Sequence, residues 1–217
     1  QVPGAVKLRE RSARKQGDPL SKTGIVGAFC KNYSIEEAMA VFIPGVYEPA
    51  GNDRYTFSGG STVGGAVVYE NKFIYSHHAT DPCSGKLCNA FDMVRLHLFG
   101  DEDAESLPDT PTNRLPSYGS MCRFISDRDE IKQLIIRERQ EQVCGAFGQP
   151  QNSGTDYDPQ WMNRLKVNPN SGNPVSTPYN MKLIIENDPA IAGKFYFDEF
   201  ADRVYVTGAM PWDAEYR

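Results

Sequence analysis

The segment from residue 55 to residue 75 constrains the fold more than any other part of the chain. Short runs of β-forming residues alternate there with glycine pairs, at Gly59–Gly60 and at Gly64–Gly65. Two of these runs, 66–69 and 73–75, are separated by only three residues. Such spacing is typical of an antiparallel β-hairpin, and paired glycines mark turns or close approaches of the backbone. We therefore expect a small sheet in this region.

Helices are predicted on both sides of this hairpin. Ser34 and Glu37 form a capping-box pattern ahead of a helix that we expect to end near Phe42. Asn89 is a second N-cap residue, and Asp92 follows it near the positively polarised start of the helix.

The whole pattern predicts an α+β chain in four parts. These are a basic flexible linker (1–23), a small mixed module of a β-hairpin sheet plus helices (24–105), a Pro-rich linker and helical connector (106–150), and a C-terminal helix plus β-hairpin (151–217). The connector helix is expected from Ser126 to about Gln142, because its apolar residues follow a helical period.

Composition and charge exclude several classes of protein. The chain of 217 residues is 40% hydrophobic and 24% charged, which is ordinary for a globular protein. It has no apolar run long enough to span a membrane and no signal-peptide pattern at Gln1, and we expect it to be a segment of a longer protein. Residues 1–22 carry a net charge of +4 and the rest carries −9. A basic arm on an acidic body can contact phosphate locally, but it cannot wrap duplex DNA.

Nucleotide-binding loops and catalytic carboxylates are not predicted. Gly85–Lys86 is similar to part of a Walker A loop, but Thr80 stands where glycine is required and Leu87 where Ser or Thr is required. Asp101-Glu-Asp103 has the spacing of a metal-dependent nucleotidyl transferase. Its acidic, Pro-rich surroundings favour a solvated loop instead.

The cysteines favour reduced thiols over a disulfide framework, because their number is odd and their spacing irregular. Zinc is the minor alternative, with His78, Cys83 and Cys88 as its ligands. The spacing argues against it, since there is no Cys-x-x-Cys and the adjacent His77 and His78 would point to opposite faces of a strand. A hydrogen-bonded polar loop is the favoured interpretation.

Nucleic-acid binding is suggested by aromatic residues on strands with cations among them, because single-stranded bases stack on such surfaces. The aromatic residues are Tyr55, Phe57, Tyr69, Phe73 and Tyr75, and the cations are Arg54, Lys72, Lys86 and Arg95. Alternatively, the aromatic residues form a small core. Both interpretations hold if core and binding surface lie on opposite faces of the sheet.

The stretch from Tyr55 to Arg95 resembles replication proteins of phages and prophages in which a primase-type region precedes a helicase domain of the virulence-associated E class. Its most specific part is Tyr-Ser-His-His-Ala-Thr-Asp-Pro (75–82), then Gly-Lys-Leu (85–87) and Asn-Ala-Phe-Asp-Met-Val-Arg (89–95). Residues 184–189, 195–200 and 208–212 resemble the segment that leads into that ATPase. The resemblance covers residues 20–105 and 160–217 and is weak between them.

A more distant resemblance is to the zinc-binding module of bacterial primases. The shared order is a strand, a turn, a strand that ends in a polar knuckle, and a helix that begins Asn-Ala-Phe-Asp. In those primases the knuckle carries Cys-x-x-Cys and an earlier Cys/His pair completes the site. Here the knuckle is Ser76-His-His-Ala79 and no earlier pair exists. The resemblance therefore implies a zinc-ribbon-like module without clear metal ligands.

These resemblances imply a non-catalytic region of a phage or prophage primase–helicase in the cytoplasm of the bacterial host. It would bind single-stranded template DNA or couple the neighbouring primase and helicase domains. The expected nucleic-acid contacts are Arg54, Lys72, Tyr75, His77, His78, Thr80, Lys86 and Arg95, and the expected structural orienters are Asp81 and Asp92. No cofactor is expected in this segment. The resemblance implies that the parent protein binds ATP and Mg²⁺, and homo-oligomerisation of the parent is one possibility.

Two other hypotheses stay open. The first is a structural spacer or oligomerisation module of a helicase ring that does not contact DNA. The second, which the residues favour least, is a metal-dependent nucleotidyl transferase that uses Asp101 and Asp103.

Overall fold

The chain forms two separate units of mixed helix and strand. The computed structural model describes residues 17–147, 159–168, 172–208, 210 and 213. Contacts divide the chain after Asp127 into residues 1–127 and 128–217. Both units combine helices with antiparallel strands, so the predicted α+β class is confirmed. The boundary lies inside the connector expected at residues 106–150.

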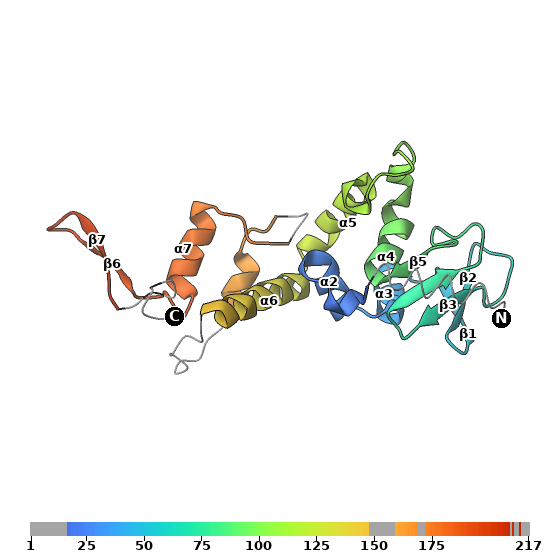
Figure 1. Ribbon diagram of the computed structural model, residues 1–217, viewed down its shortest axis with the longest axis horizontal. Helices are drawn as coiled ribbons and strands as arrows, with labels where there is room; N and C mark the ends of the chain where they lie inside the picture. Colours follow the sequence, from blue (N-terminus) through green and yellow to red (C-terminus); the bar gives the residue numbers. More distant parts are fainter. Residues whose placement is uncertain (1–16, 148–158, 169–171, 209, 211–212, 214–217) are drawn as a thin grey trace. The chain divides into compact units, whose positions relative to one another are not determined.

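The first unit is built on a five-stranded antiparallel sheet whose strands follow the order of the chain (Figure 1). Its strands are β1 (Tyr47–Gly51), β2 (Arg54–Phe57), β3 (Ala66–Tyr69), β4 (Phe73–Ser76) and β5 (Leu87–Asn89). The predicted hairpin is confirmed as β3 and β4. Its turn has left-handed backbone at Glu70 and Asn71, and the β1–β2 turn has it at Asn52 and Asp53. This backbone twist matches that of paired strands.

Helices precede and follow the sheet in the first unit. They are η1 (Pro19–Ser21), α2 (Gly24–Asn32), α3 (Ile35–Phe42), α4 (Ala90–Phe99), η2 (Gly100–Asp103), η3 (Thr112–Arg114) and α5 (Pro116–Ser126). The capping box of Ser34 and Glu37 at α3 is confirmed, as is the Asn89 cap of α4. Two helices were not expected, α2 and α5. The second of these begins inside the expected linker, with Pro116 in its first turn.

Part of the expected N-terminal linker packs against the first unit. Pro19 is buried, and a carboxylate oxygen of Asp18 lies 2.9 Å from the ammonium nitrogen of Lys72. Residues 17–23 are therefore an ordered lead-in to α2. Residues 1–16 of the expected linker lie outside the described residues.

One face of the sheet is covered by helices. Burial alternates along β3 and β4, where Ala66, Val68 and Ile74 are buried and their neighbours are half-buried. Tyr55 pairs with Ala66 and so lies on the covered face, where its hydroxyl donates to Glu36 of α3 at 2.6 Å. The ring of Phe57, on the same face, lies 5.9 Å from that of His97 in α4. Helices α3 and α4 therefore cover this face, and the opposite face is not covered by them.

The second unit consists of α6 (Asp129–Phe147), η4 (Pro159–Arg164), α7 (Pro178–Asn187), and the hairpin of β6 (Phe195–Asp198) and β7 (Arg203–Val206). The connector helix, the final helix and the second hairpin are thus confirmed, although α6 begins three residues later than expected. The hydrophobic core of the second unit contains Ile136, Trp161, Met162, Leu165 and Leu183. Within the ranges that the structure covers, no helix has both the length and the apolar character needed to cross a bilayer.

Candidate nucleic-acid interface and buried polar cluster

The uncovered face of the sheet carries aromatic and apolar side chains in two rows. Residues directly opposite each other on paired strands point to the same face. The register places Val67 between Arg54 and Tyr75, and it places Leu87 beside Tyr75. The second row pairs Tyr69 with Phe73. We call this surface the open face, and its residues are Arg54, Val67, Tyr69, Phe73, Tyr75 and Leu87.

The open face presents rings at its surface. Tyr69, Phe73 and Tyr75 are half-buried, so that their rings lie at the surface of the sheet without projecting freely into solvent. The ring of Tyr75 also lies 4.8 Å from that of His77, an exposed residue that directly follows β4. Half-buried rings on strands form a rigid platform on which flat aromatic groups can stack.

Cations lie at the edges of the open face. Arg54 is exposed and donates from Nη1 to the carbonyl of Gly64 at 3.1 Å, which directs its side chain along the loop between β2 and β3. Lys86 is exposed and directly precedes β5. Lys72, in the β3–β4 turn, pairs with Asp18 and lies 3.8 Å from a carboxylate oxygen of Glu70. Of the expected nucleic-acid contacts, the structure therefore brings Arg54 and Tyr75 onto this face, with His77 beside Tyr75. Lys86 is exposed next to β5, and Lys72 is held by Asp18.

His78 does not belong to this surface. Its side chain is buried, and its Nε2 lies 3.4 Å from the backbone N–H of Phe57, from which it accepts a weak hydrogen bond. The ring lies against two glycines: a Cβ at Gly60 or at Gly65 would come within 2.5 Å of an imidazole nitrogen. His78 therefore holds the β2–β3 loop against the knuckle. The exposed Thr80 also anchors the β2–β3 loop, because its hydroxyl donates to the carbonyl of Gly59 at 3.1 Å.

Arg95 is also unable to reach a nucleic acid. Only 6% of its side chain is exposed, and its guanidinium pairs with Asp92 at 3.2 Å and with Asp103 at 3.3 Å. It also donates to the Ser117 hydroxyl at 2.6 Å. The expectation that Arg95 contacts DNA is thus replaced by a structural role that joins α4, η2 and α5. Asp92, an expected structural orienter, accepts from Arg95 Nε at 3.2 Å and from the Asn89 side-chain amide at 3.1 Å.

Asp103, one of the two carboxylates that the nucleotidyl-transferase hypothesis requires, belongs to the same network as Arg95. Besides pairing with Arg95, Asp103 accepts hydrogen bonds from the backbone N–H of Ser117 at 3.0 Å and from its hydroxyl at 2.6 Å. Asp101 is exposed. Arg95 and Ser117 therefore hold the Asp103 carboxylate in a structural network, and Asp101 is not part of the hydrogen bonds described for that network.

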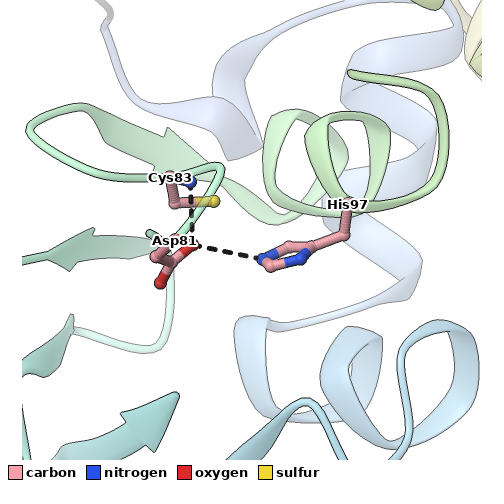
Figure 2. A group of neighbouring side chains, drawn as sticks. All are labelled: Asp81, Cys83 and His97. Carbon is pink, nitrogen blue, oxygen red and sulfur yellow. Dashed lines mark hydrogen bonds and ion pairs between the residues drawn. The ribbon is translucent and has the colours of Figure 1, made fainter. Parts of the chain in front are cut away.

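Asp81 lies at the centre of a buried polar cluster (Figure 2). Its carboxylate accepts from the backbone N–H of Cys83 at 2.8 Å and from the hydroxyl of Tyr47 at 2.8 Å. The Nε2 atom of His97 lies 3.4 Å from Asp81 and 2.8 Å from the Tyr47 hydroxyl. Asp81 is fully shielded from solvent and His97 is 6% exposed. The loop after β4 is thus fixed to α4, which supports the expectation that Asp81 orients this loop.

Burial and hydrogen bonding act in opposite directions on the ionisation of this cluster. Burial raises the pKa of Asp81, but hydrogen bonds from His97, Ser76, the Cys83 backbone and Tyr47 outweigh it and hold the pKa below its usual value. Burial, followed by the neighbouring Cys83 and Asp81, raises the pKa of the Tyr47 hydroxyl, so this group stays a proton donor. Asp81 is therefore a buried carboxylate whose ionised form is stabilised by hydrogen bonds.

The thiol of Cys83 lies in the same cluster. Hydrogen bonding with Cys88 and burial raise its pKa well above the usual value. One ligand-type atom each from Asp81, Cys83 and His97 lies within 4.8 Å of the other two. Cys83 was a ligand only in the minor zinc alternative, together with His78 and Cys88. The structure places Cys83 with Asp81 and His97, whereas the ring of His78 packs against the two glycines described above.

His97 and Tyr47 are the residues of this cluster that the sequence did not reveal. The chain has only three histidines, and His77 and His78 drew attention because they are adjacent. Histidine is a scarce side chain with metal-binding and proton-transfer chemistry, so a search that began from all three would have included His97. Tyr47 carried no signal, since its role depends on a contact with a residue 34 positions away.

Comparison with known proteins gives no relative for this chain: no family model, no curated protein and no solved structure matches it.

Proposed function

We propose that this chain is a non-catalytic, single-stranded-DNA-binding region of a phage or prophage primase–helicase. The observation that carries the proposal is the open face, where the register sets Val67, Tyr75 and Leu87 in one row beside the exposed Arg54. Bases would stack on the rings, and the cations at the border would contact phosphates. Such a region would hold template for the neighbouring primase and helicase domains in the cytoplasm of the bacterial host.

Single-stranded DNA suits this surface better than duplex DNA. Each unpaired base exposes a face that can stack on a tyrosine or phenylalanine, and this interaction tolerates any sequence. In a duplex the base faces are stacked on one another, so an aromatic platform has nothing to bind. The net charge of −5 also argues against an extended duplex-binding surface.

The test of this function is a change of one ring on the open face. Tyr75→Ala should raise the Kd for a fluorescently labelled oligothymidylate roughly 5- to 150-fold, because stacking of a base is worth about 1–3 kcal/mol. The matched control is Tyr205→Ala, which removes a tyrosine from a strand of the second unit. Thermal unfolding of both variants shows that they are folded. Equal Kd values for the wild type and Tyr75→Ala would refute the role of the open face.

The alternative of a spacer or oligomerisation module is favoured by one observation in the second unit. The β6–β7 hairpin exposes Phe197 (55%), Phe200 (101%) and Val204 (65%). A cluster of exposed apolar side chains is typical of a surface that another protein covers. If a second copy of the chain covers it, light scattering should give an oligomer for the wild type and a monomer for Phe197→Ser, with DNA binding per chain unchanged.

A further inference from the structure

The buried cluster of Asp81, Cys83 and His97 brings together three side chains of the types that bind zinc. They come from two segments, the loop after β4 and helix α4, and their side chains converge (Figure 2). Carboxylate, thiolate and imidazole groups are the common protein ligands of Zn²⁺. We propose that these three residues form a structural zinc site. The proposal is independent of the DNA-binding function.

The distances suit a single ion. Ligand atoms at about 2.0–2.3 Å from a tetrahedral zinc lie roughly 3.3–3.7 Å from one another. Asp81 Oδ1 and His97 Nε2 are 3.4 Å apart, which already agrees with that geometry. The sulfur of Cys83 lies within 4.8 Å of both partners, so a small rotation of its side chain completes the set.

Charge also favours a divalent cation here. The side chain of Asp81 is fully shielded from solvent, and the Tyr47 hydroxyl and the Cys83 backbone N–H that donate to it are neutral groups, which leave its charge uncompensated. A zinc ion bound by the Asp81 carboxylate, the Cys83 thiolate and a neutral His97 imidazole forms a site with no net charge. No other side chain has to compensate it, and the loop after β4 is then joined to α4 by metal–ligand bonds.

Two neighbouring groups contact the proposed ligands. The thiol of Cys88 is hydrogen-bonded with that of Cys83 but is not a member of the three-residue group. The hydroxyl of Tyr47 donates to Asp81 and would orient the carboxylate as an outer partner. The ligand set therefore differs from the one that the spacing of His78, Cys83 and Cys88 suggested, because His78 packs against Gly60 and Gly65.

Metal content and cobalt substitution of the whole 217-residue chain test the proposal. Mass spectrometry of metals should find one zinc per chain, and Co²⁺ should produce the thiolate charge-transfer absorption and the intense visible bands of a tetrahedral site. Cys83→Ser should abolish the charge-transfer absorption. In competition with a chromogenic chelator, His97→Gln should weaken zinc binding more than about 100-fold, beyond the 10- to 100-fold loss typical of outer partners.

The matched control is His77→Gln, which changes an exposed histidine outside the cluster and should leave zinc binding unchanged. The cobalt spectrum of the wild-type chain tests metal binding without any substitution, so a folding defect in His97→Gln does not affect this result. A folded wild-type chain that binds neither zinc nor cobalt at one equivalent would overturn the proposal. A site that survives both Cys83→Ser and His97→Gln would overturn it equally.

Discussion

The guanidinium of Arg95 lies 3.3 Å from the carboxylate of Asp103, and 6% and 17% of the two side chains are exposed. This pair connects helix α4 to the short helix that follows it. The Ser117 hydroxyl binds both partners, so the start of α5 joins the same network. Asp103 therefore anchors an otherwise exposed acidic stretch to helices α4 and α5.

Arg95→Met is expected to destabilise the first unit without altering the open face. Removal of one partner from a buried pair leaves the other charge uncompensated, which costs about 3 kcal/mol. Urea unfolding followed by circular dichroism measures the change. The control is Arg123→Met, on the exposed surface of α5, where a change within about 0.5 kcal/mol is expected. A stable Arg95→Met variant with weakened DNA binding would show that Arg95 contacts the nucleic acid after all.

Asn89→Ala should also destabilise the chain, because Asn89 is buried and its side chain caps α4 by accepting from the N–H of Asp92 at 2.8 Å. The expected loss in the free energy of unfolding is about 1–2 kcal/mol. Asn113→Ala, at an exposed position of η3, provides the control. Equal unfolding midpoints for the two variants would contradict the capping role.

Gly65→Ala should disturb the packing of His78. The added Cβ would lie 2.5 Å from Nε2 and 2.7 Å from Cε1 of the buried ring, and overpacking of this kind costs about 1–3 kcal/mol. Gly100→Ala is the matched control, since a Cβ there meets nothing within 4 Å. In the double variant Gly65→Ala/His78→Ala the two effects should not be additive. Strictly additive losses of stability would mean that Gly65→Ala does not destabilise the chain through a clash with the His78 ring.

Cys30 and Cys122 should react slowly with iodoacetamide at pH 8. Burial raises the pKa of each thiol to about 11, and only the thiolate is the nucleophile. Because the folded state keeps these groups protonated, the stability that they contribute is present below the ordinary thiol pKa and is lost as the pH rises toward 11. Peptide mass spectrometry should show little labelling of the native chain and full labelling in urea. Rapid labelling of either native thiol at pH 8 would contradict their burial.

Local signals predicted local structure well. The capping box at Ser34 and the Asn89 cap act within one helical turn, so the residues that form them are close in sequence. The β3–β4 hairpin depends on a turn of adjacent residues with left-handed backbone, which the sequence also indicates. By contrast, α5 was expected to be linker, because Pro116 looks like a breaker although proline fits the first turn of a helix.

The candidate sites depend on contacts that no local pattern contains. The Asp81–His97 pair joins residues 16 positions apart, and the network that holds the buried Arg95 includes Ser117, 22 positions away. The sequence identified cations and aromatic residues by type, but only the strand register separated the open face from the covered one. Tyr75 lies on the open face for this reason, while Tyr55, another aromatic strand residue, points toward α3.

Binding of single-stranded DNA to the open face is tested by fluorescence anisotropy of a labelled oligonucleotide titrated with the wild-type chain. At about 50 mM salt we expect binding, and at about 200 mM salt binding should be roughly 5- to 10-fold weaker, because phosphate contacts from Arg54 and Lys86 release about two counterions. No binding at about 50 mM salt, with the chain folded, would contradict the account.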